Sequence, residues 1–407
     1  MIQNPFRTFK NSAYLFYWAF NTFSLLGTWI DFTLRQWIIV EMIKNERAAT
    51  QYVGFYNLVR FVPSLFLSFI AGYLSDRIGA RLILFFVSLI DFFNACAISY
   101  LVYTNNLNVY NFMILALFLG ITNSFYFPSR SKLINSIVQD KEDIPSSFSW
   151  QGISFNLSRI IGPVVAGMIA KNFGLALGFL LNAISYIPLI FYLLFLNDKV
   201  GNNSFEDKRN VFTSIFEDFK NTISYVSCRV KLKKCFYSIF TINFWGISLM
   251  SFLQVFTKEI LNENINYFSY LLSMLGLGAV IGAFFVASTN YQVILNTREE
   301  IFIIIYGICI LLLTLLPKFS FFIMFLIGFS QSLVFGFTNN KVQLLTDNDM
   351  IGKVSGIYSL FNITLSYLGV FVISQVGYLF GVLNLFKIVA FIVIFSAFMI
   401  GIKVKEG

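Results

Sequence analysis

Charged side chains stand inside long apolar stretches of this sequence, where a charge is costly and function is the usual reason to keep one. A carboxylate in such a place can carry a proton, and a guanidinium can bind an acidic group of a substrate. A lysine near the end of a stretch is a weaker candidate, because its long side chain can reach the membrane surface. The candidates are Asp31, Arg35, Arg60, Asp91 and Arg159, with Lys387 as the weaker sixth.

Asp31 and Arg35 are four residues apart, so they share one helix face and can form an ion pair. A paired aspartate stays ionised and carries a proton only if a substrate breaks the pair. A static structural pair is the alternative. Asp91 is favoured as a structural partner of Arg60 over a proton site. Arg159 is favoured as a residue that binds an acidic substrate group or exchanges between carboxylates.

Composition narrows the chemistry further. The 407 residues are 57% hydrophobic and 12% charged, they include no histidine, and the mean hydropathy is +0.74. A soluble chain carries about 25% charged residues, so this composition excludes a soluble globular protein. Without histidine there are no imidazole metal ligands and no histidine-activated nucleophiles. We therefore expect no enzyme, no metal and no cofactor, and a proton would have to be carried by a carboxylate.

Twelve apolar stretches are long enough to cross a membrane, since each crossing needs about 20 residues. The long polar connection at 197–235 turns amphipathic, with apolar residues at helical spacing from Phe212 to Val226. We predict an all-α membrane protein with a six-helix bundle over 1–196, a cytoplasmic linker with an amphipathic helix over 197–235, and a second six-helix bundle over 236–407. The twelve stretches run approximately over 13–42, 52–74, 82–103, 111–128, 147–170, 174–196, 236–257, 267–288, 300–316, 319–338, 354–375 and 379–402.

Lysine and arginine predict the orientation, because cytoplasmic loops carry most of them. If the N-terminus is cytoplasmic, then Arg7, Lys10, Arg77, Arg81 and the basic linker all lie on that side, and few cations lie on the other. The sequence therefore predicts a multi-pass protein of the inner (plasma) membrane with both termini in the cytoplasm. The net charge of +9 is explained by the basic residues of the cytoplasmic segments, so it requires no nucleic-acid partner.

The segment between the second and third stretches reads Gly72-Tyr73-Leu74-Ser75-Asp76-Arg77-Ile78-Gly79-Ala80-Arg81. It resembles motif A of the major facilitator superfamily, G-x-x-x-D-R-x-G-x-R-R/K, and departs from it at Leu82, where the pattern has a basic residue. An ordinary basic turn, with Gly79 ending a helix, is the alternative.

The resemblance implies a gate on the cytoplasmic side, made by Gly72, Asp76, Arg77, Gly79 and Arg81. In that gate the glycine at 72 allows close helix packing. The aspartate accepts hydrogen bonds from amides near 352–355 and pairs with Arg130, which ends the segment 127–130.

A second motif lies in the fifth stretch, where Ser158-Arg159-Ile160-Ile161-Gly162-Pro163-Val164-Val165-Ala166-Gly167 resembles motif C of antiporters and exporters of that superfamily. Pro163 bends the helix, and Gly162 and Gly167 let neighbouring helices approach. A kinked packing helix with no bearing on direction is the alternative. Together with Gly27-Thr28-Trp29-Ile30-Asp31, these residues make the chain similar to the enterobactin-exporter and macrolide-efflux branch, the drug:proton antiporter-3 group. Trp29 is also a candidate for a cavity wall.

The second half offers amides rather than carboxylates inside its spans. Because no carboxylate accompanies these amides, coupling chemistry is expected in the first half. Acidic loops at 140–144 and 347–351 stand half a chain apart, as an internally duplicated six-span unit predicts. The polar points of the second half are Asn243, Gln254, Asn339, Asn340 and Asn362.

These features favour a secondary active transporter. No Walker A loop is present, so an ion gradient, with protons favoured, would drive alternating access of the two halves. The resemblance implies export of a siderophore, a drug or a similar amphipathic small molecule by a proton antiporter, and we expect a monomer in the lipid bilayer. Uptake by proton symport or facilitated diffusion is the alternative on the same fold. A non-transporting membrane receptor is the alternative of another class.

Overall fold

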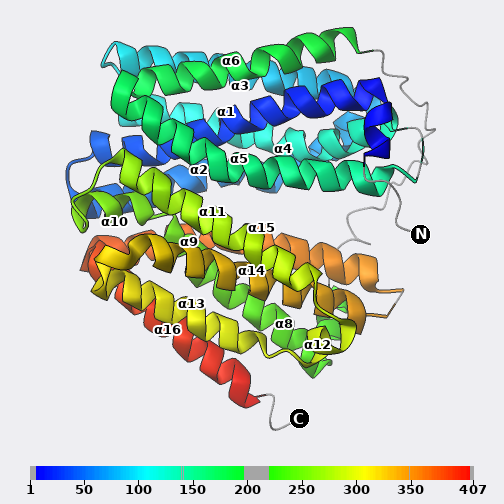
Figure 1. The fold of residues 1–407 in the computed structure, drawn as a ribbon, viewed down its shortest axis with the longest axis vertical. Helices are drawn as coiled ribbons and strands as arrows, with labels where there is room; N and C mark the ends of the chain where they lie inside the picture. Colours follow the sequence, from blue (N-terminus) through cyan, green and yellow to red (C-terminus); the bar gives the residue numbers. More distant parts are fainter. Residues whose placement is uncertain (1–5, 139, 141, 197–219, 348, 404–407) are drawn as a thin grey trace. The chain divides into compact units, whose positions relative to one another are not determined.

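The computed structural model describes residues 6–138, 140, 142–196, 220–347 and 349–403 (Figure 1). Every regular element within these ranges is a helix. A helix satisfies its own backbone hydrogen bonds, so apolar stretches of this length can cross hydrocarbon only in this form or as a closed barrel. The expected all-α architecture is confirmed for the described residues.

In the first half, a short 3-10 helix, Arg7–Lys10, precedes six long helices. The boundaries follow local signals. The side chain of Asn11 accepts hydrogen bonds from two amides at the start of the first long helix, and Gly79 and Gly174, both with positive φ, separate later helices. The helices are α1 (Ser12–Met42), α2 (Glu46–Ile78), α3 (Ala80–Tyr103), α4 (Val109–Ile137), α5 (Ile144–Phe173) and α6 (Leu175–Phe195).

In the second half, the first long element changes its winding along its length. It begins as α8 (Val230–Phe240), becomes the π-helix η2 (Thr241–Ile247), and continues through α9 (Ser248–Met250) to α10 (Leu253–Glu259). The remaining helices are α11 (Ile265–Ala287), α12 (Tyr291–Asn296), α13 (Glu299–Leu315), η3 (Pro317–Phe319), α14 (Ser320–Leu345), α15 (Ile351–Phe380) and α16 (Val382–Lys403).

Eight of the described helices are long and apolar enough to cross a membrane, and a ninth crossing results if Val230–Met250 and Leu253–Glu259, bent by 41°, form one span. Three further helices, α1, α2 and α13, fall outside that count; α13 has 17 residues. The protein is a multi-pass membrane protein, and the number of twelve spans remains a prediction.

Contacts group the chain into two compact units. Unit 1 comprises Met1–Lys44, Phe55–Asn202 and Glu263–Ser273, and unit 2 comprises Asn45–Gly54, Asn203–Asn262 and Met274–Gly407. Each unit thus contains a short helical segment from the other half of the sequence, which the sequence did not predict. The boundaries expected at 196 and 235 remain a prediction, because much of the linker lies outside the described residues.

Within unit 1, α1 packs against both α5 and α6, and α3 packs against α4 and α6 (Figure 1). Within unit 2, α13 packs against α14 and α16, and α15 packs against the π-helix. Glycines permit the closest of these approaches. A Cβ on Gly27 would collide with Ser185 of α6, and a Cβ on Gly178 would collide with Leu34 of α1. Helix α1 is therefore held closely along its length, which fixes the charged residues that it carries.

The first acidic loop is tied to the N-terminal 3-10 helix. Arg7 donates a hydrogen bond to Glu142 at 3.0 Å, lies 3.3 Å from Asp143, and also pairs with Asp140. The hydrogen bond to Glu142 and the charges of Asp143 and Asp140 raise the pKa of Arg7 above its ordinary value. These groups are largely exposed, so the cluster orients the loop more than it stabilises the fold.

Of the predicted amphipathic linker helix, residues 220–227 are helical, with Thr222 and Val226 buried. Phe212, Ile215, Phe216 and Phe219, which carried much of the pattern, lie outside the described residues.

Candidate functional site

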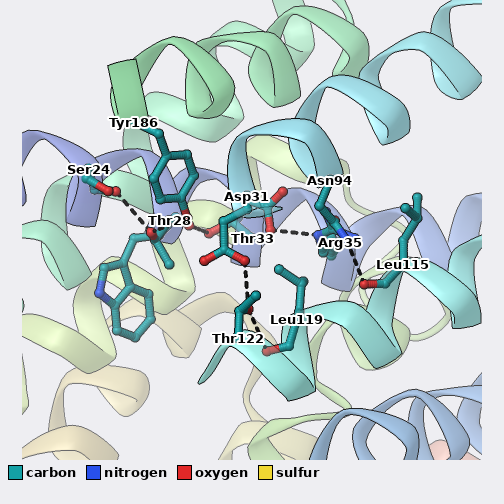
Figure 2. Close-up of polar contacts among 12 residues, drawn as sticks. Ser24, Thr28, Asp31, Thr33, Arg35, Asn94, Leu115, Leu119, Thr122 and Tyr186 are labelled. Carbon is teal, nitrogen blue, oxygen red and sulfur yellow. Dashed lines mark hydrogen bonds and ion pairs between the residues drawn. The ribbon is translucent and has the colours of Figure 1, made fainter. Parts of the chain in front are cut away.

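Asp31 and Arg35 form an ion pair on one face of α1. Arg35 Nε donates a hydrogen bond to Asp31 Oδ2 at 2.6 Å, and the two side chains are 1% and 8% exposed, respectively. A second nitrogen of Arg35 donates to Asn94 Oδ1 at 2.8 Å, and Asn94 in turn donates to the carbonyl of Leu115 at 2.9 Å (Figure 2). The pair is therefore linked to α3 and α4. Asn94 was missed because a lone asparagine in an apolar stretch carries no distinctive spacing.

Asp91 lies on α3 one turn before Asn94, and its Oδ1 accepts a hydrogen bond from Thr122 of α4 at 2.7 Å. The carboxylate is half-buried and lies within electrostatic reach of Asp31, Arg35 and Arg60. Two acids and two bases thus gather inside unit 1. We call Asp31, Arg35, Arg60 and Asp91 the charge cluster.

Close packing of α2 on α4 places Arg60. A Cβ on Gly120 of α4 would collide with the Arg60 carbonyl and lie 3.1 Å from Pro63, so only glycine fits at this crossing. Thr122, the hydrogen-bond partner of Asp91, stands two residues further along α4. The crossing of α2 and α4 therefore places Arg60 at the same level as Thr122, the residue that donates a hydrogen bond to Asp91.

Two hydroxyl groups, one on α1 and one on α6, border the charge cluster. Thr28 Oγ1 donates to the carbonyl of Ser24 at 2.9 Å and lies 3.1 Å from the Tyr186 hydroxyl (Figure 2). Tyr186 is buried and lies within electrostatic reach of Asp91 and Asp31. Hydroxyls can both donate and accept, so the Tyr186 hydroxyl can donate to Thr28 Oγ1 while Thr28 donates to the Ser24 carbonyl.

Motif C shapes the contact of α5 with α1. A Cβ on Gly162 would lie 2.5 Å from Trp29 Cβ and 3.2 Å from the Trp29 carbonyl carbon. Gly167 faces α11 in the same way, because a Cβ there would lie 2.7 Å from Ser269 Oγ. Pro163 stands inside the helix beside Gly162. The two predicted glycines thus act as contact points within unit 1.

Arg159 precedes this crossing on α5. It is half-buried, and within the described part of the chain its guanidinium forms no hydrogen bond or ion pair. Burial and the absence of a protein partner leave it able to bind an anion. Trp29, also predicted as a site residue, packs edge-on against Phe155 at 5.5 Å and Phe32 at 5.3 Å. Phe155 is one turn before Arg159, so the tryptophan and the arginine lie near the same stretch of α5.

The motif A segment lies at the junction of α2 and α3. Gly79, with φ of 99°, separates the two helices, and Arg81 donates a hydrogen bond to the carbonyl of Leu196. Arg77 is exposed. Arg130 on α4 lies over the rings of Tyr126 and Phe127 at 5.5 and 5.4 Å. The surroundings of Gly72 and the side chain of Asp76 lie outside what the structure describes, so the predicted pairing of Asp76 with Arg130 remains a prediction.

Unit 2 contains a cavity of about 570 Å³ bounded by α11, α14 and α15. Three of the asparagines identified in the sequence line it, together with two serines that the sequence analysis did not single out. Its lining includes no charged residue among the described residues. The polar residues are Asn339, Asn340, Asn362, Ser332 and Ser359. Volume and lining suit a small molecule that offers several oxygen atoms for hydrogen bonding.

Asn362 connects this cavity to the π-helix. Asn243 Nδ2 donates to Asn362 Oδ1 at 2.9 Å and to the carbonyl of Ile239 at 3.0 Å. Asn243 Oδ1 accepts from Ser366 at 3.1 Å. π-Helical turns are often found at functional sites, and here one side chain of the turn fixes a cavity residue.

The expectation that no carboxylate lies inside the second half is wrong. Glu299, at the first turn of α13, is fully buried and pairs with Lys341, whose Nζ also donates to the carbonyl of Thr297 at 2.5 Å. Glu300 pairs with Lys234 at 2.8 Å, also with little exposure. Two glutamates following Arg298 resemble an ordinary helix start, and only the packing of α8 and α14 around them reveals their burial.

Comparisons with known proteins identify the family of this chain. A family model described as transmembrane secretion effector matches residues 3–406. A Staphyloferrin A transporter of Staphylococcus aureus (strain NCTC 8325 / PS 47) is 24% identical over 257 residues, which cover 63% of this chain and 62% of that protein. The chain thus matches less than two thirds of the length of this curated relative.

Solved structures show the same fold at low identity. A bacterial homolog to the human lysosomal transporter Spinster, in an inward-facing and occupied conformation, matches with a TM-score of 0.72 at 10% identity, covering 99% of this chain and 98% of that chain. A D-xylose-proton symporter matches with a TM-score of 0.65 at 14% identity, covering 97% and 96%. The chain therefore belongs to the transmembrane secretion effector family and is a transporter of the major facilitator superfamily.

Proposed function

We propose that this transporter exports a siderophore or a similar amphipathic small molecule in exchange for protons, through alternating access of its two six-helix halves. The observation that carries the proposal is the different bonding of two carboxylates in the charge cluster. Asp31 is buried and held by a guanidinium, whereas Asp91 is half-buried and accepts one hydrogen bond from a neutral hydroxyl. Charge-assisted hydrogen bonds are about twice as strong as neutral ones, so Asp31 is the more firmly fixed.

Asp91 is therefore the better proton carrier. It can gain or lose a proton without breaking an ion pair, because its described hydrogen bond comes from the neutral hydroxyl of Thr122. Asp31 takes part only in a step that separates it from Arg35. The neighbouring positive charges of Arg35 and Arg60 then respond to the protonation of Asp91, which provides a physical link between proton movement and helix packing.

Each unit offers one candidate element for binding the cargo. In unit 1, Arg159 offers a cation without a protein partner among the described residues, which suits an acidic group. In unit 2, the amide-lined cavity suits hydroxyl, carbonyl or carboxyl oxygens. The relative named as a Staphyloferrin A transporter supports a siderophore as the cargo class.

Export is favoured over uptake by two observations. The matched family is described as a secretion effector, and the glycines of motif C form the close contacts of α5 that the resemblance to exporters implies. We further propose that both termini are cytoplasmic, that the membrane is the inner (plasma) membrane, and that the protein acts as a monomer. Gly72, Asp76, Arg77, Gly79, Arg81 and Arg130 would then form the cytoplasmic gate.

The test uses inside-out membrane vesicles containing the full chain and radiolabelled staphyloferrin A as the probe. With the vesicle interior acidic, we expect the wild type to accumulate the probe and to lose accumulation when the gradient is collapsed. Asp91→Asn should lose gradient-driven accumulation yet retain exchange of probe across the membrane without a gradient. Asp349→Asn, an exposed aspartate on a loop, is the matched control and should behave as wild type.

Different results contradict different parts of the proposal. Accumulation only in right-side-out vesicles with acid outside would establish uptake by symport. Full gradient dependence in Asp91→Asn would exclude Asp91 as the proton carrier. If neither vesicle orientation moves the probe, while wild-type protein is folded and inserted, the siderophore assignment is wrong.

A further inference from the structure

One basic residue at the start of α8 lies between two cavities on the outer surface of unit 2. The first cavity, about 460 Å³, lies between α8 and α16 and is walled on the far side by Phe395, Met399 and Ile400. The second, about 320 Å³, lies between α8, the helical residues 220–227 and α15. Both cavities share four lining residues. These are Ser227, Lys233, Tyr237 and Phe240.

The charges at this end of α8 differ in their partners. Lys234 pairs with Glu300 at 2.8 Å, and Arg229 pairs with Asp347 at 2.6 Å and lies over the Tyr225 ring at 3.9 Å. Lys233 is exposed, and its only described interaction is with the Tyr237 ring, 5.9 Å away. Among the described residues, Lys233 therefore has no anionic partner, although it lines both cavities.

The position of Lys233 matches the headgroup level of a membrane. The apolar span of this element runs from Val230, so its first turn lies at one end of the crossing. Tyr237 and Phe240, four and seven residues on, share the face of Lys233 and lie about 6 and 10 Å deeper along the axis. The surface thus changes from cationic to aromatic with depth. Phe395 and Tyr237, both exposed, continue the apolar wall.

We propose that this surface binds one anionic diacyl phospholipid. Its phosphate lies at Lys233, and its two acyl chains follow the two cavities on either side of Tyr237 and Phe240. Basic residues at the ends of membrane helices attract anionic lipids, and the paired apolar grooves supply the contacts that a free anion cannot use. The proposal is independent of the direction of transport and of the cargo.

The test measures lipid bound to the purified full-length protein by native mass spectrometry. The probes are palmitoyl-oleoyl phosphatidylglycerol and the zwitterionic phosphatidylcholine with the same chains. We expect preferential retention of phosphatidylglycerol, and about a fivefold loss of it in Lys233→Gln. Lys231→Gln is the matched control, since Lys231 is exposed on the same helical turn but lines neither cavity, and its loss should stay below twofold.

A second variant tests the apolar grooves without changing charge. Met399→Trp fills the cavity between α8 and α16 and should also reduce phosphatidylglycerol retention, while circular dichroism and gel filtration remain as in wild type. Equal losses in Lys231→Gln and Lys233→Gln, with no effect of Met399→Trp, would mean diffuse attraction only and overturn the proposal. Displacement of the lipid by millimolar inorganic phosphate would identify a simple anion site and also overturn it.

Discussion

Arg35 donates a 2.6 Å hydrogen bond to Asp31 one turn earlier on α1, and both side chains are almost completely removed from solvent. A buried pair of this kind contributes little net stability compared with apolar residues of equal size, because both charges had to be desolvated. Removing one partner is different, since it leaves the other charge buried without compensation. The energetic coupling between Asp31 and Arg35 should therefore be measured by comparing single and double substitutions.

We predict that Asp31→Asn and Arg35→Gln each lower the free energy of unfolding by about 3–5 kcal/mol. The double variant should recover a large part of that loss, because neither charge is then left alone. The measurement is denaturant unfolding in detergent micelles, followed by circular dichroism. Glu41→Gln is the control on the same helix. Glu41 is exposed and accepts a hydrogen bond from Trp37 Nε1 at 2.7 Å, which the glutamine carbonyl can still accept, so the variant should change stability by less than about 1 kcal/mol. Additive losses in the double variant would contradict a paired role.

Glu299 and Lys341 provide the equivalent test in unit 2. We expect Lys341→Met to be more harmful than Glu299→Gln, because it leaves a fully buried carboxylate and also removes the hydrogen bond to the Thr297 carbonyl. The loss for Lys341→Met should again be about 3–5 kcal/mol, with partial recovery in Glu299→Gln/Lys341→Met. Thermal unfolding in detergent gives the ranking. Lys318→Met, at an exposed lysine of η3, is the control and should be close to neutral. A similar loss of stability in that variant would contradict a special role for the buried pair.

Composition and motif spacing predicted the all-α membrane fold and the superfamily, and both are confirmed. In hydrocarbon only helices and closed barrels satisfy the backbone hydrogen bonds. The length of an apolar stretch therefore indicates a membrane-spanning element directly. Spacing also identified Gly162 and Gly167, whose contacts with Trp29 and Ser269 leave no space for a side chain. The local sequence was sufficient at these two positions, because a glycine has no side chain and this property is what allows the close contact.

Tertiary partners could not be predicted in the same way. Thr122 binds Asp91 only because α3 and α4 pack at that level, and Glu299 is buried only because α14 places Lys341 beside it. The π-helical turn Thr241–Ile247 also contains no proline and no pair of glycines that would indicate an irregular helix there. It is held by side-chain bonds from α15, a distant segment, so neither periodicity nor composition could indicate it.

The π-helical turn leads to a prediction about Asn243. In Asn243→Leu, Asn362 loses its donor, and Ser366 keeps only the longer hydrogen bond to the Asn362 carbonyl at 3.3 Å, so we expect a loss of about 1–3 kcal/mol in the free energy of unfolding. Amide hydrogen exchange at 241–248 should accelerate as well. Ser238→Ala is the control, because Ser238 is buried nearby and its hydroxyl makes no hydrogen bond among the described residues. Slower or unchanged exchange in Asn243→Leu would mean that the backbone alone maintains the turn.

The contact of Gly162 with Trp29 leads to the prediction with the best internal control. A methyl group at Gly162 would lie 2.5 Å from Trp29 Cβ and 3.2 Å from the Trp29 backbone carbon, so α1 or α5 must shift. At Gly152, ten residues earlier on α5, a Cβ would meet no atom within 4 Å. We expect Gly162→Ala to lower the free energy of unfolding by about 1–3 kcal/mol through overpacking. Gly152→Ala should be neutral or slightly stabilising, because alanine favours the helix over glycine by up to about 1 kcal/mol.

Transport measurements on the same two variants distinguish an effect on helix packing from an effect on function. A shift at the Trp29 contact displaces Asp31, two residues further along α1, and with it the ion pair to Arg35. Gly162→Ala should therefore reduce the rate of staphyloferrin A accumulation in vesicles by more than the loss of folded protein explains. Gly152→Ala should transport at the wild-type rate per folded molecule. Equal transport by both variants, after correction for the folded fraction, would mean that Gly162 acts only in helix packing. It would also mean that motif C does not influence the charge cluster.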